Sequence, residues 1–383
     1  MNIRITPTLL KGHIEIPSSK SEAHRALLCA GLALPGSRVS GITDSADITA
    51  TRQALKGLET DGIIPCNESG STLRFMLPIA LARGGSFVFT GKGRLLERPL
   101  DEYFKIFQRQ GITYNLNAAD GKLSVSGRLK SGVFLLRGDV SSQYITGLLL
   151  ALPMLEGDSE IVLTTPLQSA SYVEMTCRVM KAFGVQIQKT ESDYAIPGGQ
   201  KYRPCDYEVE ADYSQAAFWL VANALGSSVS MQALSAQSVQ GDQVIAEILQ
   251  RKRRSLLIDV GDCPDLVPIL AVYCCFCEGE SRIVNAARLR FKESDRLYAI
   301  AKELNAIGGS VTEERDALQI SGKGFLQGGK ADSHNDHRIA MALAIAATRC
   351  EKEVLIQGAE CVGKSYVDFW EHYRQLGGKA DEC

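Results

Sequence analysis

One pattern recurs six times along this chain of 383 residues and restricts the folds open to it. Each copy consists of a polar cluster, a mostly apolar stretch, a turn of small residues and a β-branched strand. The clusters are at 18–21, 69–72, 141–143, 212–215, 263–265 and 335–338. A helix that is apolar on nearly every face is buried. If its first turn is polar, its free N–H groups point toward a hydrogen-bond acceptor. Six such helix starts facing one space would favour an anion.

The pattern predicts buried helices, for example at 26–34 and 339–347, each followed by a strand. Such strands are expected at 38–42, 86–90, 160–163 and 353–356. A second series of amphipathic segments ends at a glycine, the expected helix stop; these segments are 55–62, 103–111, 176–184, 297–308 and 369–377. Two of the six units are shortened, because only one strand (63–68 or 256–260) separates their amphipathic helix from the next polar cluster.

We therefore predict an α/β (α+β) fold of two lobes, each built from three βαβαββ-type units. Each lobe would be an inside-out α/β barrel, with small sheets outside and three buried helices at its centre. A chain of this length exceeds one ordinary core, which also favours two domains.

Composition excludes several classes of function. The net charge of −2 provides no global field for nucleic acid or an anionic membrane, so we expect neither partner. A basic run at 251–254 is interpreted as a solvated helix end. The longest apolar stretches, 148–155 and 266–277, fall short of the ~20 residues that a bilayer requires. We expect a cytoplasmic monomer.

Eleven cysteines occur without paired metal spacing. Cys274, Cys275 and Cys277 lie in an apolar run with no second Cys/His cluster beside them. The cysteines are interpreted as small buried hydrophobic residues in a reducing compartment. No metal and no cofactor is predicted.

The polar clusters at the first two helix starts combine a cation with hydroxyl groups. In the first, Ser21 is a predicted N-cap between Lys20 and Arg25, and Arg25 lies one turn further on the same face. A lysine, a hydroxyl and an arginine at a helix start are typical of a phosphate or carboxylate site. A capped helix with two solvated cations fits this motif equally well. The second cluster, 70–74, has Gly70 for close backbone approach and Arg74 one turn later.

Neutral donors dominate the third cluster. Ser141, Ser142 and Gln143 are followed by Ser169 and Tyr172, a set suited to a polyhydroxylated or phosphorylated ligand. A run of N-cap serines is an equally common alternative.

Two charged clusters lie in the second half of the chain. The segment 292–296 has four charged residues and would ordinarily form a solvated face. The quartet 335–338 opens an apolar helix, so its charges must be paired or used. Arg94–Pro99 has two arginines and suits a mobile anion clamp, and Lys364 precedes the last helix.

Together and in this order, the motifs resemble those of the enolpyruvyl transferases, most closely the EPSP synthase branch. The resemblance rests on segments that span nearly the whole chain: 17–28, 68–74, 97–99, 141–143, 292–297, 335–338 and 361–364. It implies that residues 1–19 and 210–383 form one discontinuous lobe and residues 20–209 the other, with the active site in the cleft between them.

The resemblance also implies an activity, the transfer of the enolpyruvyl group of phosphoenolpyruvate to the 5-hydroxyl of shikimate 3-phosphate, with release of phosphate. Shikimate 3-phosphate would contact Lys20, Ser21, Arg25, Ser141, Ser142, Gln143, Ser169, Tyr172, Asp265 and Lys292. Phosphoenolpyruvate would contact Lys20, Gly70, Arg98, Gln143, Arg296, Arg338 and Lys364. The catalytic residues would be Asp265, Glu293, Lys20 and Lys364, with the two carboxylates moving protons.

Some features leave alternatives open. Arg288 stands where the family often has asparagine, and the assignment of each proton transfer to Asp265 or Glu293 stays open. The sister enzyme that uses UDP-N-acetylglucosamine usually has a cysteine before the Arg-Pro pair, but no cysteine occurs between Cys66 and Cys177. A non-catalytic anion-binding module of the same fold is the third possibility, although binding alone needs no paired carboxylates.

Overall fold

The computed structural model describes residues 1–190, 193–232, 234–251 and 254–383. The described chain divides into two compact units. Unit 1 comprises Met1–Pro17 and Glu210–Cys383, and unit 2 comprises Ser18–Val209. The resemblance implied that the chain passes from one lobe to the other after residues 19 and 209. In the structure the first boundary follows Pro17, two residues earlier, and the second follows Val209.

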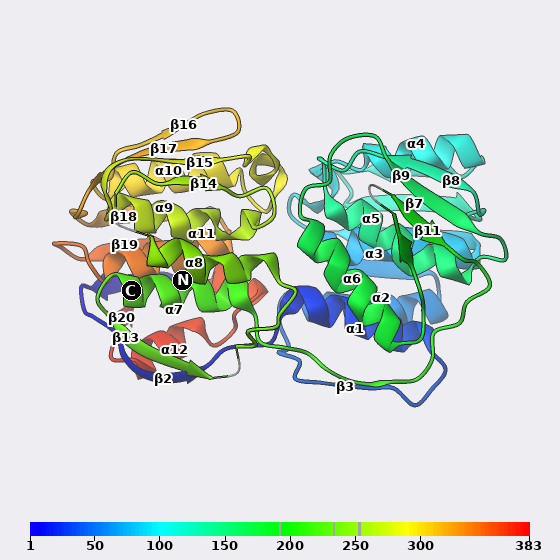
Figure 1. Cartoon of the computed structure of the whole chain (residues 1–383), viewed down its shortest axis with the longest axis horizontal. Coiled ribbons are helices and arrows are strands. Elements are labelled where there is room, and N and C mark those ends of the chain that lie inside the picture. Colours follow the sequence, from blue (N-terminus) through cyan, green and yellow to red (C-terminus); the bar gives the residue numbers. More distant parts are fainter. Residues whose placement is uncertain (191–192, 233, 252–253) are drawn as a thin grey trace. The chain divides into compact units, whose positions relative to one another are not determined.

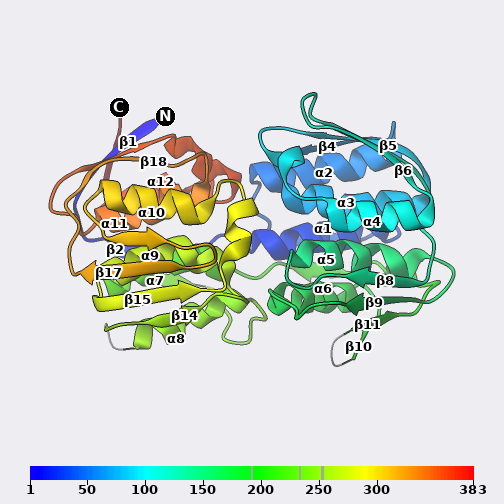
Figure 2. The ribbon, with the colours of Figure 1, turned by 90° about the horizontal axis from the view of Figure 1, so that it is seen from above.

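Each unit contains two four-stranded sheets and one two-stranded sheet (Figures 1 and 2). In unit 2 the four-stranded sheets have the orders β4-β5-β7-β6 and β10-β11-β9-β8. Their strands are β4 Ile63–Asn67, β5 Gly85–Gly91, β6 Thr113–Asn117, β7 Lys122–Gly127, β8 Val133–Leu136, β9 Ser159–Leu163, β10 Gln188–Lys189 and β11 Tyr194–Ile196. The predicted strands 86–90 and 160–163 are thus confirmed as β5 and β9.

Unit 1 repeats this arrangement with the orders β14-β15-β17-β16 and β18-β19-β1-β20. The strands are β1 Asn2–Thr6, β14 Leu257–Asp259, β15 Glu278–Val284, β16 Val311–Glu313, β17 Leu318–Lys323, β18 Gly329–Asp332, β19 Val354–Gln357 and β20 Lys379–Glu382. In all four sheets one edge strand pairs in parallel with its neighbour and the other two pairings are antiparallel. In the sheet β18-β19-β1-β20, the N-terminus of the chain supplies β1 and the C-terminus supplies β20. Both ends of the chain therefore belong to unit 1, which makes this unit discontinuous.

The two-stranded sheets belong to the shortened repeats. Strand β3 (Arg38–Ser40) pairs in parallel with β12 (Asp206–Glu208), and β2 (Lys11–Glu15) pairs in parallel with β13 (Ser228–Gln232). Neither shortened repeat contributes a hairpin of its own, because β4 and β14 join the sheets of the following repeats. The prediction of four full and two shortened repeats is confirmed.

Six helices follow the polar clusters: α1 Lys20–Leu32, α3 Gly70–Arg83, α5 Ser142–Ala151, α7 Tyr213–Ala224, α9 Val267–Cys275 and α11 His337–Ala347. Every residue of α9 and α11 is buried, as the apolar composition predicts. In unit 1, α7, α9 and α11 pack against one another (Figure 1). In unit 2, α3 packs on α5, whereas α1 packs chiefly on α2 (Ala46–Glu59) and α6 (Ala170–Ala182) and keeps one face less buried.

Five of these six helices begin with a side-chain cap from the polar cluster, provided by Ser19, Ser69, Ser141, Asp212 and Asp336. The prediction of Ser21 as an N-cap is therefore wrong, because Ser19 caps α1 and Ser21 is its second residue. The helices expected at 26–34 and 339–347 begin earlier than the apolar run, since the capping residue and not the first apolar residue sets a helix start. The sixth start differs, because Pro264–Leu266 forms a 3₁₀ turn before α9 and Asp265 makes no cap.

The remaining helices are α4 Asp101–Gln110, α8 Ile245–Gln250, α10 Arg296–Ala306 and α12 Phe369–Gln375. Together with α2 and α6 they are the amphipathic helices of the sequence pattern, with one buried and one exposed side. Gly111 ends α4 at a φ of 69°, a left-handed conformation that glycine adopts without strain.

Within the described ranges, no helix is long and apolar enough to cross a bilayer, and no group of acidic, histidine or cysteine side chains is arranged to hold a metal ion. Cys274, Cys275 and Cys277 are buried, as expected. Residues Lys252 and Arg253 of the basic run lie outside the described ranges.

Candidate active site

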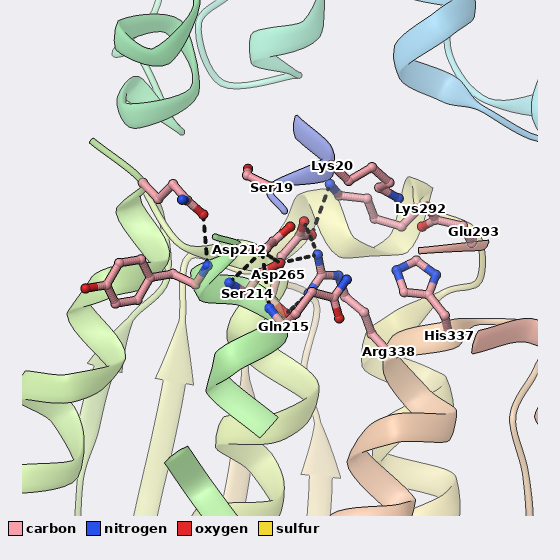
Figure 3. Close-up of polar contacts among 12 residues, drawn as sticks. Ser19, Lys20, Asp212, Ser214, Gln215, Asp265, Lys292, Glu293, His337 and Arg338 are labelled. Carbon is pink, nitrogen blue, oxygen red and sulfur yellow. Dashed lines mark hydrogen bonds and ion pairs between the residues drawn. The ribbon is translucent and has the colours of Figure 1, made fainter. Parts of the chain in front are cut away.

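The centre of the polar cluster in unit 1 is Asp265, which lies in the 3₁₀ turn before α9. Its Oδ1 accepts a bond of 2.9 Å from Nη1 of Arg296, and its Oδ2 accepts one of 3.0 Å from Nη2 of Arg338. The ammonium of Lys292 lies 3.4 Å from Oδ1. Asp265 therefore lies among three cations, two of which, Lys292 and Arg338, are seen beside it in Figure 3. This carboxylate is therefore contacted by side chains of α10, of α11 and of the segment before α10.

Arg296, the first residue of α10, binds carboxylates on three sides. Its guanidinium donates to Asp265, to Glu293 at 2.7 Å and to Asp336 at 2.7 Å. The side chain is only 1% exposed. Burial disfavours its charged form, but the three carboxylates outweigh burial and raise the pKa of Arg296 above its ordinary value. The expectation of a solvated face at 292–296 is wrong for this residue, since Asp295 caps α10 and turns Arg296 inward.

Asp336 is fully buried and joins two elements. It caps α11 by accepting the N–H of Arg338, and it also accepts from Ser294 Oγ at 3.0 Å and from two nitrogens of Arg296. These donors satisfy both oxygens of the buried carboxylate. It fixes the start of α11 against the start of α10.

Arg338 in α11 reaches two further elements of unit 1. Its Nη2 donates to Ser214 Oγ at 3.0 Å, in addition to Asp265. Ser214 also donates to the capping carboxylate of Asp212 at 2.5 Å. The polar starts of α7, α9 and α11 are thus linked through one guanidinium (Figure 3).

The other predicted residues of unit 1 lie on the same set of elements. Glu293 contacts Arg296, and Lys364, at the end of the 3₁₀ helix Ala359–Lys364, donates to the carbonyl oxygen of Asn335 at 2.9 Å. Asn335 has a φ of 54°, an uncommon left-handed conformation for a residue other than glycine. Arg288 donates to the carbonyl oxygen of Gly261 at 2.7 Å, so in this structure it braces the segment before Asp265.

In unit 2, Lys20 and Ser21 form the first turn of α1. The Lys20 ammonium lies 2.9 Å from Oδ2 of Asp47 in α2, and both side chains are mostly buried. Ser21 is partly buried, and its carbonyl oxygen accepts a bond from Arg25. The cation and the hydroxyl therefore lie at the same helix start, as predicted.

Arg25 is buried and has neutral partners. Its guanidinium donates to Thr176 Oγ1 at 2.8 Å, to Thr146 Oγ1 at 3.3 Å and to the carbonyl oxygens of Ser21 and Tyr172. Burial lowers the pKa of Arg25 to about 10, against the opposing fields of Tyr172 and Glu22. The group therefore keeps its charge at neutral pH, although no carboxylate of the described residues bonds to it.

Gly70 opens α3 beside Arg98. A Cβ at position 70 would lie 2.5 Å from Nη1 of Arg98 and 2.8 Å from its Cζ. Only glycine therefore allows the guanidinium to approach the helix start this closely. Arg98 follows the 3₁₀ helix Leu95–Glu97, and Arg94 forms an exposed pair with Glu97 at 3.4 Å.

Gln143 is held between α3 and α5. Its Oε1 accepts from Arg74 at 3.0 Å and its Nε2 donates to Ser71 Oγ at 3.0 Å, which fixes the orientation of the amide. Arg74 also donates to the carbonyl oxygen of Pro99, the residue after Arg98, at 2.9 Å. Arg74, which the sequence analysis placed among candidate anion ligands, thus orients Gln143 and the segment that follows Arg98.

The neutral donors of unit 2 lie at two helix starts. Ser141 caps α5 and Ser142 is its first residue, while Ser169 precedes α6 with a φ of 57°. Ser169 makes no capping hydrogen bond among the described residues. The Tyr172 carbonyl oxygen, one turn into α6, accepts from Arg25 and Thr176.

Several residues that complete these clusters were missed from sequence. The partners of three of them are distant in the chain, so no local motif marks Asp47, Thr146 or Thr176. The fourth, Asp336, belongs to the charged quartet 335–338, which must be paired because it precedes an apolar helix. The sequence did not identify its partner.

Comparisons with known proteins identify the family of this chain. The family model of EPSP synthase (3-phosphoshikimate 1-carboxyvinyltransferase) matches residues 5–64 and 59–373. Relatives named 3-phosphoshikimate 1-carboxyvinyltransferase include one from Clostridium kluyveri, 45% identical over 99% of this chain and 98% of its own length. Another, from Clostridium acetobutylicum, is 46% identical over the same shares. The first alignment covers 421 positions, more than the 383 residues of this chain, so the relative has stretches without a counterpart here.

Among solved structures, EPSP synthase from Acinetobacter baumannii matches with a TM-score of 0.81 and 24% identity, over 100% of both chains. At this identity the likeness concerns the fold, which is the two-lobed α/β architecture with buried central helices that the sequence predicted.

Proposed function

This chain belongs to the EPSP synthase family, and on that premise we propose that it transfers the enolpyruvyl group of phosphoenolpyruvate to the 5-hydroxyl of shikimate 3-phosphate and releases phosphate. The observation that carries the proposal is the cluster around Asp265, in which the carboxylates of Asp265 and Glu293 are held by hydrogen bonds and ion pairs to Arg296, Arg338 and Lys292. Binding of an anion needs the cations alone, whereas addition followed by elimination also needs groups that move protons.

Charge decides how the two substrates would be held. Both are polyanions, so their mutual repulsion must be offset by cations, each charge-assisted hydrogen bond contributing ~1.5–3 kcal/mol. We assign Lys20, Gly70, Arg98, Gln143, Arg296, Arg338 and Lys364 to phosphoenolpyruvate. We assign Lys20, Ser21, Arg25, Ser141, Ser142, Gln143, Ser169, Tyr172, Asp265 and Lys292 to shikimate 3-phosphate.

The reaction itself is an addition and an elimination. The 5-hydroxyl oxygen bonds to C2 of phosphoenolpyruvate while its proton goes to a base and C3 receives a proton. The C2–O bond to phosphate then breaks, C3 returns a proton, and phosphate leaves with the bonding electrons. Asp265 and Glu293 are the groups assigned to these transfers, and Lys20 and Lys364 stabilise the charge of the departing phosphate.

The cations also hold the carboxylate in place. Arg296, Arg338 and Lys292 surround Asp265 in the structure. An anionic substrate that binds these cations would compete with Asp265 for them and so would lie next to its carboxylate.

The test is a phosphate-release assay with each substrate alone and with both, on the purified full chain. We expect release only when shikimate 3-phosphate and phosphoenolpyruvate are both present. Release with UDP-N-acetylglucosamine in place of shikimate 3-phosphate would move the chain to the sister enzyme. Binding of phosphoenolpyruvate without release in either mixture would leave only the anion-binding module. Light scattering of the same sample would test the proposed monomer.

A further inference from the structure

A buried chain of hydrogen bonds connects α1, α2 and α3 in unit 2, outside the residues assigned to substrates. His24 Nδ1 lies 2.7 Å from Thr51 Oγ1, and Thr51 Oγ1 lies 2.7 Å from Thr72 Oγ1. Thr72 Oγ1 donates to Ser69 Oγ at 2.8 Å. All four side chains are at most 1% exposed. The chain ends on the residue that caps α3, immediately before Gly70.

The hydrogens in this chain can be assigned by counting donors. Thr72 donates its hydroxyl hydrogen to Ser69, so it must accept the hydroxyl hydrogen of Thr51. Thr51 then has no hydrogen left for His24, and the imidazole must donate from Nδ1. Because each hydroxyl has one hydrogen, every hydrogen bond in this series is donated in the same direction, from α1 toward the cap of α3.

The state of the imidazole agrees with this count. Burial, assisted by the charges of Lys20 and Arg25, lowers the pKa of His24 well below its ordinary value, so the ring is neutral at pH 7. Its Nε2 is buried and has no hydrogen-bond partner among the described residues. A buried polar atom without a partner costs free energy, which indicates that the ring is retained for the bond made by Nδ1.

Beside this series of hydrogen bonds, an ion pair also connects α1 and α2. Lys20 and His24 lie one turn apart on α1, and Asp47 and Thr51 lie one turn apart on α2. The Lys20–Asp47 ion pair and the His24–Thr51 bond are therefore successive links between the two helices. Only the second link continues, through Thr72, to the start of α3.

From this geometry we infer that His24 and Thr51 are positioning residues, which hold the first turn of α1 with Lys20 in register with the first turn of α3 with Gly70. The inference rests on the proposed function, because Gly70 is assigned to phosphoenolpyruvate and Lys20 to both substrates. His24 and Thr51 would not touch either substrate. Buried side-chain hydrogen bonds of this kind restrict the movement of the helices that they join.

The kinetic test uses Thr51→Val, which keeps the shape of the side chain and removes the hydroxyl. We expect the KM for phosphoenolpyruvate, which is assigned to both turns, to rise about tenfold, because small misplacements of binding groups are costly. The KM for shikimate 3-phosphate, which is assigned to the first turn of α1 only, should rise less, and kcat should stay within about threefold of wild type. Thr51→Ser restores the hydroxyl and should restore the KM. Thr348→Val is the matched control, a buried threonine of unit 1 with one carbonyl partner.

A purely structural role would give a different result. Thr51→Val would then lower the free energy of unfolding as Thr348→Val does and leave all three kinetic constants within about twofold of wild type. That outcome overturns the inference, as does a failure of Thr51→Ser to recover the KM. If Thr51→Val does not fold, His24→Asn and His24→Leu are compared instead. The asparagine amide can still donate to Thr51, so His24→Asn should raise the KM less than His24→Leu does. Equal KM values in these two variants would overturn the inference.

A spectroscopic measurement separates this inference from the proposed function. In protein labelled with ¹⁵N-histidine, the signals that disappear in His24→Asn should be those of a neutral ring protonated at Nδ1. A ring protonated at Nε2 would contradict the assigned polarity whether or not the wild type turns over. An inactive wild type with the Nδ1–H ring would instead refute the proposed function and leave the hydrogen-bond chain intact.

Discussion

The two units have the same architecture but neutralise their buried arginines differently. In unit 1, Arg296 and Arg338 bond to the carboxylates of Asp265, Glu293 and Asp336. In unit 2, Arg25 and Arg74 bond to hydroxyl, amide and carbonyl oxygens, and no carboxylate of the described residues reaches them. One fold thus supports a cluster of ion-paired arginines in one copy and arginines with neutral partners in the other.

This difference follows from the helix starts. In unit 1 the 3₁₀ turn at Pro264–Leu266 leaves Asp265 free of a capping role, and Asp336 caps α11 while it binds Arg296. In unit 2 all three starts are capped by serine, which brings no charge. A buried cation with neutral partners, such as Arg25, suits an anionic ligand, whereas the ion pairs of unit 1 hold carboxylates in fixed positions.

The largest effect is expected on removal of the central arginine of unit 1. Arg296→Met should lower the free energy of unfolding by about 3–5 kcal/mol, because Asp336 and Glu293 would remain as buried charges without their partner. Urea denaturation measures the loss. Arg282→Met is the control, since Arg282 is half exposed and its pair with Glu314 should contribute less than about 1 kcal/mol. Equal losses in the two variants would remove the distinction between the clusters.

A second prediction concerns turnover. Asp265→Asn keeps a side chain of the same shape and should lower kcat by ~10²-fold or more, since an amide cannot accept a proton from the reacting groups. Steady-state kinetics with both substrates measures this, and Asp259→Asn, an exposed aspartate of β14, serves as the control. Turnover at the wild-type level would exclude Asp265 from acid–base chemistry.

In unit 2 the expected effects are on binding. Gly70→Ala would place a methyl group 2.5 Å from the Arg98 guanidinium and displace it, so the KM for phosphoenolpyruvate should rise about tenfold. Gly31→Ala, later in α1, meets only the flexible end of Leu55 and should leave that KM unchanged. If both variants bind phosphoenolpyruvate equally, the close approach of Arg98 has no function.

The smallest effect concerns pH. The pKa of His24 is lowered in the folded protein, so below about pH 6.5 the unfolded chain binds a proton that the folded chain does not. Stability should therefore fall as pH decreases through this range, by up to about 1.4 kcal/mol per pH unit from this residue. His24→Asn should lose less stability than wild type between pH 7.5 and 5.5 in urea denaturation. Parallel curves would show that His24 is not held neutral.

The sequence predicted the architecture better than the contacts. Local signals, namely the polar cluster, the apolar run and the glycine stop, recur with each unit and are sufficient to predict six buried helices and the two shortened repeats. Helix starts were predicted with an error at α1, because Ser19 and Ser21 are both good caps and only the preceding backbone distinguishes them. Burial of Arg296 was not predicted, since a charged segment is ordinarily exposed.

The partners of the buried charges required the folded chain. Asp336 is distant in sequence from Arg296, and Thr51 and Thr176 belong to different helices from His24 and Arg25. No local period relates these residues, so the sequence gives candidates for the site but not the bonds that orient them. The resemblance to a family named the substrate residues, whereas the residues that position them came from the structure.

The division of roles between the units can be tested most directly by measuring two constants in two variants. Calorimetric titration gives the Kd for shikimate 3-phosphate, and the phosphate assay gives kcat at saturating substrates. We predict that Arg25→Lys, which loses the planar fork of donors, raises Kd at least about tenfold with little change in kcat. Asp265→Asn should lower kcat and leave Kd within about threefold. The reverse pattern, or equal changes of both constants in both variants, would contradict the account.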